Sequence, residues 1–289
     1  KRIMLTRIIT AVVLIAAVLA WLFKANFEVF SMGALFIYAV SAYEMGPLLG
    51  YKSRIPFILI AIVAATIAFF VANPGLYVSA GIPKFSQYVV ASGLIVWFVS
   101  IPLLLKFPND TAWHKNVVLN TVIALLMLLP FLEGILILRS CDYALDYNSG
   151  ACLVLAVMAL VWCADSGAYF AGRFLGKHKM LPNVSPKKTV EGLAGGIITA
   201  LIGLYIFDKL GWFGQYSQKQ GVLVIASVIT IIFSVIGDLV ESMFKRLAGI
   251  KDSGKIFPGH GGMLDRIDSQ LAAVPVFLTM VWLFSGELF

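Results

Sequence analysis

Charged residues are scarce in this sequence. Asp, Glu, Lys and Arg make up 13% of its 289 residues and hydrophobic residues make up 60%, whereas about a quarter of an ordinary globular protein is charged. This shortage excludes a soluble globular chain and a disordered one. A helix needs about 20 apolar residues to cross the hydrocarbon core of a bilayer. We therefore expect an all-α fold, a polytopic integral membrane protein with about nine transmembrane helices.

Cysteine is also scarce. The chain has three cysteines, which are too few for a disulfide framework. Cys163 falls inside an apolar run, where we expect a small packing residue. Cys141 and Cys152 flank a short segment, and a bridge between them stays open if that segment lies outside the cytoplasm. No long polar segment separates the apolar runs, which excludes a single membrane anchor joined to a large soluble domain.

Apolar runs bounded by charge, proline or glycine mark the expected spans. The first run, Ile8 to Phe23, has no small-residue cleavage site after it, so we interpret it as a retained helix and not as a signal peptide. The expected spans are residues 8–23, 28–48, 55–73, 85–105, 117–138, 150–172, 191–208, 220–241 and 269–287.

Basic residues lie unevenly between these spans. The net charge is +7, which in a soluble protein would suggest a nucleic-acid partner, but here membrane topology explains it and no nucleic acid is expected. If the spans alternate in direction, one side of the membrane holds most of the 22 basic residues and the other side holds only five. Those five are Lys24, Lys84, Arg139, Lys209 and Lys219. Since positive loops stay in the cytoplasm, we expect the N-terminus inside and the C-terminus outside.

The chain changes character near residue 150. Residues 1–149 form an expected N-terminal transmembrane region of about five helices with short loops. Residues 150–289 form an expected catalytic transmembrane region of about four helices. Two long cytoplasmic loops, 173–190 and 242–268, carry most of its charge, glycine and proline, so we expect the chemistry there.

An acidic residue lies within the sixth expected span. Asp165, Tyr169 and Arg173 are four residues apart and share one helix face. Ionisable groups within membrane spans are costly and usually mark a function. The alternative is an Asp165–Arg173 pair, or an Asp–Lys pair, that only locks helices together.

A lysine pair precedes the seventh expected span. Ser185 before Pro186 is typical of a helix cap with proline in the first turn, so we expect the helix to begin there. Its first amides would face an anion, and Lys187 and Lys188 would add positive charge. The alternative is that these lysines set topology or contact lipid headgroups.

The end of the eighth expected span carries a polar stripe. Asp238, Glu241, Ser242 and Lys245 follow at helical spacing. The segment after them, 246–269, contains five glycines and one proline, which permit tight turns and close approach of backbone to a ligand.

Two more aspartates, Asp265 and Asp268, begin the ninth expected span and share a face. They can meet Asp238, and oxygen ligands of this kind suit Mg²⁺ with bound phosphates. Lys245, Arg246, Lys251 and Arg266 suit phosphate oxygens. Either aspartate alone could instead favour a helix N-terminus, and His260 could be an exposed loop residue. Together these residues indicate metal-assisted phosphoryl or nucleotidyl transfer at the inner membrane face.

The stretch from Ser242 to Asp268 resembles a known family signature. It reads S-M-F-K-R-L-A-G-I-K-D-S-G-K-I-F-P-G-H-G-G-M-L-D-R-I-D and is similar to that of the phosphatidate cytidylyltransferases, or CDP-diacylglycerol synthases. The resemblance extends to A-D-S-G-A-Y at 164–169 and S-P-K-K-T at 185–189. Before residue 150 it rests only on hydropathy. Val190 departs from the pattern, because relatives often carry an aromatic residue there.

The resemblance implies the conversion of CTP and phosphatidate into CDP-diacylglycerol and pyrophosphate, with Mg²⁺ and room for a second cation. It implies a homodimer in the bacterial cytoplasmic membrane, with the active site facing the cytoplasm. Asp238, Asp265 and Asp268 would be the metal ligands and act in catalysis with Lys245 and Arg246. The implied substrate-binding residues are Asp165, Lys187, Lys188, Ser242, Lys251, Asp252, His260, Gly261, Gly262 and Arg266.

Two other classes remain possible on the residues alone. A transporter would place its ionisable groups near the bilayer midplane within an internal repeat, and no repeat is visible. A CTP-dependent polyprenol kinase would share the metal and nucleotide features but would release CDP.

Overall fold

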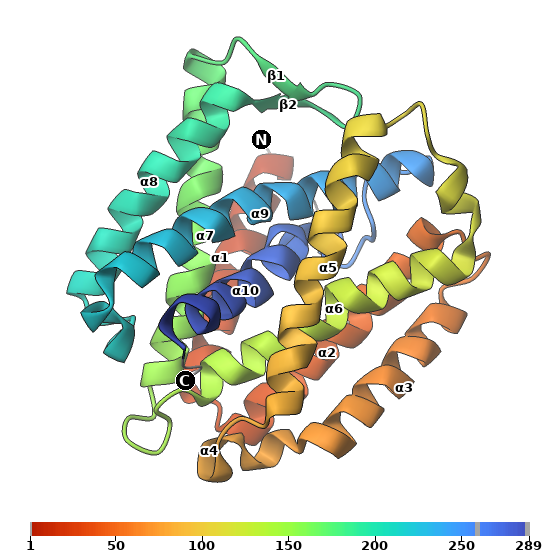
Figure 1. Cartoon of the computed structure of the whole chain (residues 1–289). Helices are drawn as coiled ribbons and strands as arrows, with labels where there is room; N and C mark the ends of the chain where they lie inside the picture. The colour runs from red at the N-terminus through yellow and green to blue at the C-terminus, as the bar shows by residue number, and fades with distance from the viewer. Residues whose placement is uncertain (1, 258–260, 287–289) are drawn as a thin grey trace.

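Helices dominate the structure, a computed structural model that describes residues 2–257 and 261–286, with side chains from residue 12 onward. Figure 1 shows the bundle that they form. The long helices are α1 (Arg2–Lys24), α2 (Phe27–Met45), α3 (Ile55–Ala72), α5 (Lys84–Lys106), α6 (Val117–Ser140), α7 (Ser149–Phe174), α8 (Val190–Lys209), α9 (Gln220–Leu247) and α10 (Leu264–Ser285). The short elements are α4 (Tyr77–Ala80), the 3₁₀ turns Gly46–Leu49, Pro74–Leu76, Ala112–Lys115 and Gly214–Gln218, and the strands β1 (Lys179–Leu181) and β2 (Ser185–Thr189).

Eight segments of the described chain are long and apolar enough to cross a membrane, one for each long helix from α2 to α10. Helix α1 adds a shorter apolar stretch, Val12–Lys24, within its described side chains. The all-α polytopic prediction is therefore confirmed, and its count of about nine spans agrees with these helices. The last span begins at Leu264 and not at residue 269, so Asp265 and Asp268 lie within the helix itself.

Helix α10 occupies the centre of the bundle. Its side chains are buried almost without interruption from Ser269 to Val281, which is expected of a helix that is covered on every side. Helices α5, α6, α7 and α9 pack against it, and α3 lies at the edge of the bundle in Figure 1. On α3 large side chains face outward, and Phe70 is 89% exposed, as a lipid-facing surface requires.

Helices α7 and α8 pack closely because glycine leaves room between them. A Cβ on Gly167 would lie 1.9 Å from Thr199 Oγ1, and one on Gly195 would lie 2.2 Å from the Ala171 Cβ. Small residues allow membrane helices to approach in this way. The Thr199 hydroxyl also donates a hydrogen bond to the Cys163 carbonyl oxygen across the interface, at 2.9 Å.

A β-hairpin joins α7 to α8, where the sequence predicted an early helix start. The prediction of Ser185 as a helix cap is wrong, because Ser185 and Pro186 belong to β2, which pairs antiparallel with β1. Proline is tolerated on an edge strand. The N-cap of α8 is Thr189, whose hydroxyl accepts a hydrogen bond from the Gly192 amide at 3.1 Å.

The cysteines are not bridged. Cys141 and Cys152 are both free, so the disulfide left open by the sequence is not present. Burial, together with the neighbouring Asp142, raises the pKa of the Cys141 thiol above its usual range. A thiol held in its neutral form reacts slowly with oxidants.

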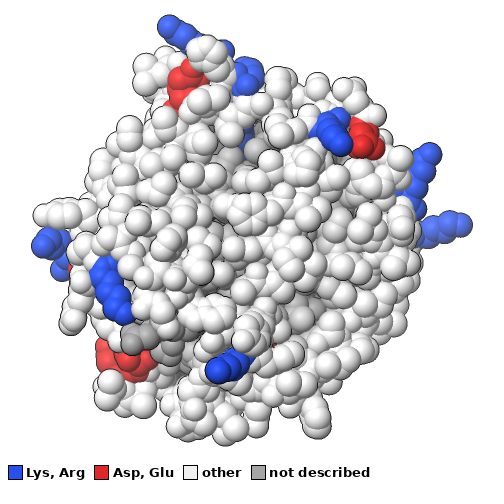
Figure 2. Space-filling view, in the orientation of Figure 1, with Lys and Arg blue, Asp and Glu red and all other residues white. Residues whose placement is uncertain are grey.

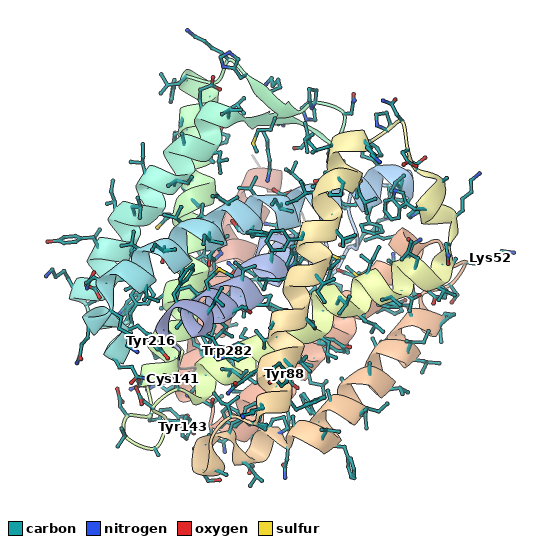
Figure 3. The ribbon with its side chains drawn as sticks, viewed as in Figure 1. Lys52, Tyr88, Cys141, Tyr143, Tyr216 and Trp282 are labelled. Carbon is teal, nitrogen blue, oxygen red and sulfur yellow. The ribbon has the colours of Figure 1, made fainter. Side chains whose placement is uncertain are left out.

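The connections gather at two opposite ends of the bundle. At one end the Tyr147 hydroxyl donates to the Ala25 carbonyl oxygen, and at the other Arg54 donates to the Ser253 carbonyl oxygen at 3.4 Å. Figure 3 shows Cys141 and Tyr143 at the first end, far from Lys52. This separation matches the alternation of spans that the basic residues predicted.

Charged side chains avoid the centre of one face of the molecule (Figure 2). In Figure 2 the centre of the visible face is uncharged, and the lysines, arginines and acidic residues lie toward its margins. Arg139 is basic but fully buried. Its guanidinium donates hydrogen bonds to the Tyr147 and Ala25 carbonyl oxygens, both at 3.2 Å. An uncharged belt with polar ends is what a bilayer-spanning bundle requires.

Candidate active site at the ends of α9 and α10

Helix α9 carries the predicted polar stripe out of the membrane. Its 28 residues reach about 42 Å at 1.5 Å per residue, which exceeds a hydrocarbon core of about 30 Å. The last turns of α9 can therefore extend beyond the core. On this stretch Ser242 Oγ donates to Asp238 Oδ1 at 3.3 Å, and Lys245 forms an ion pair with Glu241.

Lys245 joins the two helices. Its ammonium group lies 2.9 Å from Asp265 Oδ1, at the start of α10, and also contacts Glu241 Oε2 on its own helix. Glu241 is 1% exposed, and a buried carboxylate without a counter-charge would be costly. Lys245 therefore compensates two carboxylates at the point where α9 and α10 meet.

The second oxygen of Asp265 binds two residues, Ser253 and Gly262, of the segment between α9 and α10. Asp265 Oδ2 accepts hydrogen bonds from the Gly262 amide at 2.8 Å and from the Ser253 amide and hydroxyl, both at 3.0 Å. A Cβ on Gly261, at a φ of +82°, would lie 2.7 Å from the same oxygen. Both oxygens of Asp265 are thus engaged by protein donors, and both predicted glycines lie beside it.

A second ion pair brings the hairpin to α9. Lys188 Nζ lies 2.6 Å from Asp238 Oδ2. Asp165 on α7 is close enough to interact electrostatically with both of these residues, so the structure brings it into the cluster as predicted. The alternative Asp165–Arg173 pair is not observed, because Arg173 donates instead to the Tyr169 hydroxyl at 3.0 Å.

Asp268 lies one turn further along α10. Its Oδ1 accepts a hydrogen bond from the Ser269 amide at 2.7 Å, and its charge interacts with Asp238 and with the two site lysines. The helices approach closely here, since a Cβ on Gly237 would lie 2.8 Å from the Asp268 carbonyl oxygen. Asp238 and Asp268 therefore face one another from neighbouring helices.

The donor set bears on the metal prediction. Within the described residues no group of three His, Cys, Asp or Glu side chains is arranged to hold a metal ion. The oxygens of Asp238 and Asp268 keep acceptor capacity, whereas those of Asp265 are taken. Carboxylate oxygens are the hard ligands that Mg²⁺ prefers, so the chemistry of Asp238 and Asp268 fits this ion. The Mg²⁺ site stays a prediction.

The remaining predicted residues surround this cluster. Lys187, Arg246 and Arg266 are exposed, and none makes an ion pair with the described part of the chain. Lys251 and Asp252 are also exposed and line a cavity of about 750 Å³ with Arg54 and Tyr43. His260 lies outside the described residues, so its predicted role stays a prediction. Basic side chains without a protein partner remain available to phosphate oxygens.

The first half of the chain supplies site residues that the sequence did not reveal. Glu44, near the end of α2, contacts Ser253 and Leu264. Arg54 donates to the Ser253 carbonyl oxygen through both terminal nitrogens, at 3.4 Å. A signal was present, because Glu44 is an acidic residue well inside the expected span 28–48, whose other acidic residue, Glu28, lies at its start. Its partners lie more than 200 positions away, which no local pattern could predict.

A membrane-spanning helical bundle that gathers carboxylates and lysines at one end defines a membrane-embedded enzyme for phosphate-bearing substrates. The ion pairs of the candidate site lie toward the end of α9 and the start of α10, whereas a transporter would place its ionisable groups near the bilayer midplane. The chain belongs to the cytidylyltransferase family, whose family model matches residues 5–284. It is therefore a nucleotidyltransferase.

Curated bacterial proteins are similar to almost the entire chain. A phosphatidate cytidylyltransferase of Haemophilus influenzae is 39% identical, over 94% of this chain and 96% of that protein. One of Pseudomonas aeruginosa is 37% identical over 96% of both chains. One of Bacillus subtilis is 32% identical over 99% of this chain and 98% of that protein. The similarity therefore includes the first half, where the sequence showed only hydropathy.

Proposed function

We propose that this chain is a phosphatidate cytidylyltransferase. It joins CTP to phosphatidate, forming CDP-diacylglycerol and releasing pyrophosphate. The observation that carries the proposal is the cluster of Asp238, Lys188, Lys245 and Asp265 within a chain that matches its relatives from end to end. The similarity favours this activity over that of a CTP-dependent polyprenol kinase.

The reaction needs positioning and charge neutralisation more than proton transfer. A phosphate oxygen of phosphatidate attacks the α-phosphorus of CTP, a new P–O bond forms, and the bond to the β-phosphate bridge breaks. The nucleophile is already ionised near neutral pH, so no general base is required. Lys188 and Lys245 lie at the cluster, and the exposed Arg246 and Arg266 are placed to bind phosphate oxygens.

Asp238 on α9 and Asp268 on α10 are the proposed Mg²⁺ ligands, and Asp265 supports Asp268 from the same helix. Bound Mg²⁺ would neutralise negative charge on the triphosphate. Lys188 pairs with Asp238 at 2.6 Å, so its ammonium group lies at the proposed site, where it could also bind a substrate phosphate. A second cation stays an open proposal.

The proposed setting is the bacterial cytoplasmic membrane, with the site on its inner face. The uneven basic residues support this orientation, and phosphatidate would then enter from the inner leaflet while CTP arrives from the cytosol. A homodimer is proposed from the family resemblance.

The test is the fate of two labels in purified protein with phosphatidate. With CTP labelled at the α-phosphate we expect label in the lipid phase, and with CTP labelled at the γ-phosphate we expect label in pyrophosphate. A polyprenol kinase would give the opposite pattern with a polyprenol acceptor. Lipid labelling from the γ-position, or no lipid labelling with phosphatidate, would reject the proposal.

A further inference from the structure

Glu44 is a buried acidic residue that joins the first half of the chain to the signature loop. It is 1% exposed and lies near the end of α2. Its Oε2 accepts a hydrogen bond from the Leu264 amide at 2.8 Å and lies 3.3 Å from Ser253 Oγ. Leu264 is the first residue of α10, so Glu44 binds the point where that helix begins.

Two glycines leave space for this carboxylate. A Cβ on Gly254 would lie 1.9 Å from Glu44 Oε1, and a Cβ on Gly262 would lie 2.4 Å from Glu44 Oε2. Neither glycine has a positive φ, so their backbone conformations are open to any residue. A methyl group at either position would therefore force the Glu44 carboxylate to move.

Ser253 connects Glu44 to Asp265. The Ser253 hydroxyl lies 3.0 Å from Asp265 Oδ2 and 3.3 Å from Glu44 Oε2. It has one proton and can donate to only one of these carboxylates at a time. The Ser253 amide donates a further hydrogen bond to Asp265. A displacement of Glu44 would therefore shift Ser253, which is fully buried, and through it Asp265.

We infer that Glu44 is a positioning residue for the transfer reaction, an inference that rests on the proposed function. Glu44 holds Ser253 and Leu264 against α2, and Ser253 in turn holds Asp265 in place to pair with Lys245. The first half of the chain thereby sets the geometry of the catalytic half. Glu44 borders the cavity of about 750 Å³ but is 1% exposed, so we assign it a role through Asp265 and not a contact with substrate.

The space that Gly254 leaves gives a test by suppression. Gly254→Ala should lower kcat by about tenfold or more, because the new methyl group displaces the Glu44 carboxylate. Glu44→Asp is one methylene shorter and makes room for that methyl group. The double variant should therefore exceed Gly254→Ala in kcat by about threefold or more. If the double variant loses the product of the two single losses, the inference is wrong. Gly221→Ala is the control, since no atom lies within 4 Å of its Cβ position.

Hydrogen exchange tests the same contact without relying on activity. In Glu44→Gln and Glu44→Ala, the amides of residues 250–257 and 261–266 should exchange faster than in the unaltered protein, with α5 and α6 unchanged. The matched control is Glu133→Gln, which alters an equally buried glutamate that accepts a hydrogen bond from the Tyr77 hydroxyl at 2.6 Å. Unchanged exchange in the loop, or the same exchange pattern in the control, would overturn the inference.

The two proposals can fail separately. If the unaltered protein does not label phosphatidate but Glu44→Ala still releases the loop, the proposed reaction is wrong and the structural role of Glu44 stands. If the protein labels phosphatidate and the Glu44 variants keep full kcat and normal loop exchange, only the inference fails.

Discussion

At the scale of single residues, Asp238 and Asp265 have different partners in one cluster. Asp238 receives one lysine and one hydroxyl, whereas Asp265 receives one lysine, one hydroxyl and two amides. Asp265 therefore fixes the neighbouring backbone, whereas the oxygens of Asp238 accept fewer hydrogen bonds and can bind a cation more readily. Asp238 pairs with Lys188 and Asp265 pairs with Lys245, so each carboxylate contributes one ion pair to the cluster.

We expect Asp238→Asn and Asp265→Asn each to lower Mg²⁺-dependent turnover about a hundredfold or more, with little further loss in the double variant because they act as a unit. Only Asp265→Asn should also lower the thermal unfolding midpoint, because the side-chain NH₂ of the new asparagine would lie against hydrogen-bond donors that now bind the carboxylate. Turnover at several Mg²⁺ concentrations and thermal unfolding provide the measurements. Asp110→Asn is the control, an exposed aspartate outside the cluster. Full activity in both single variants would place the metal site elsewhere.

Arg246 offers a test of phosphate binding. The arginine is exposed and has no ion pair within the described chain, so Arg246→Lys should leave thermal unfolding unchanged. It keeps the charge but loses the two-pronged guanidinium, and the lost charge-assisted hydrogen bond costs about 1.5–3 kcal/mol. We expect kcat/KM to fall about tenfold to a hundredfold. Unaltered kcat/KM in the lysine variant would show that the fork is not used.

Helical spacing made part of the site predictable. Asp238, Glu241, Ser242 and Lys245 lie on one face because α9 is regular there, and Asp265 and Asp268 share a face for the same reason. Glu44 could not be assigned, because its role depends on a contact between segments far apart in sequence. The partners of Asp265 were equally hidden, since loop amides carry no sequence signal.

At the scale of elements, the hairpin between α7 and α8 shows where a local signal misleads. Ser-Pro is compatible with a helix start and with an edge strand, and pairing with β1 decides between them. Thr189 then becomes the helix cap, next to the Lys188 that reaches Asp238. Thr189 and Lys188 are consecutive residues, so the start of α8 sets the position of Lys188.

Removal of this cap should therefore have two effects. Thr189→Ala leaves the Gly192 amide without its hydroxyl acceptor and should cost about 1 kcal/mol of stability. It should also lower activity by loosening Lys188, whereas Thr189→Ser should restore both properties. Thermal unfolding and turnover measured on the same preparations provide the check. If Thr189→Ala and Thr189→Ser are indistinguishable, the hydroxyl does not hold the hairpin.

At the scale of the whole molecule, the class of fold followed from composition, because apolar runs of this length have few other structures available. Composition did not predict which helices lie at the centre of the bundle and which lie at its edge. Helices α3 and α10 are both apolar enough to span a membrane, although the mean hydropathy of α10 is lower. The tertiary contacts show that α10 is surrounded by other helices and that α3 lies at the edge (Figure 1).

Orientation can be tested with single cysteines in a chain whose own three cysteines are replaced. Leu145 is 87% exposed at the end expected outside, and Lys187 and Lys251 are exposed at the opposite end. A membrane-impermeant thiol reagent applied to intact cells should label Leu145→Cys and not the other two variants. After permeabilisation all three should react. Labelling of Lys187→Cys or Lys251→Cys in intact cells would reverse the proposed topology.

The central position of α10 has a consequence for biogenesis. The helices that pack around it, α2, α5, α6, α7 and α9, precede it in the chain and leave the ribosome first. These helices must therefore stay apart, or separate again, until α10 has entered the membrane. Asp265 and Asp268 arrive with this late helix, so the newly made protein gains its acidic cluster only in the closing stage of assembly, and a chain stalled before α10 would hold an open bundle without a site.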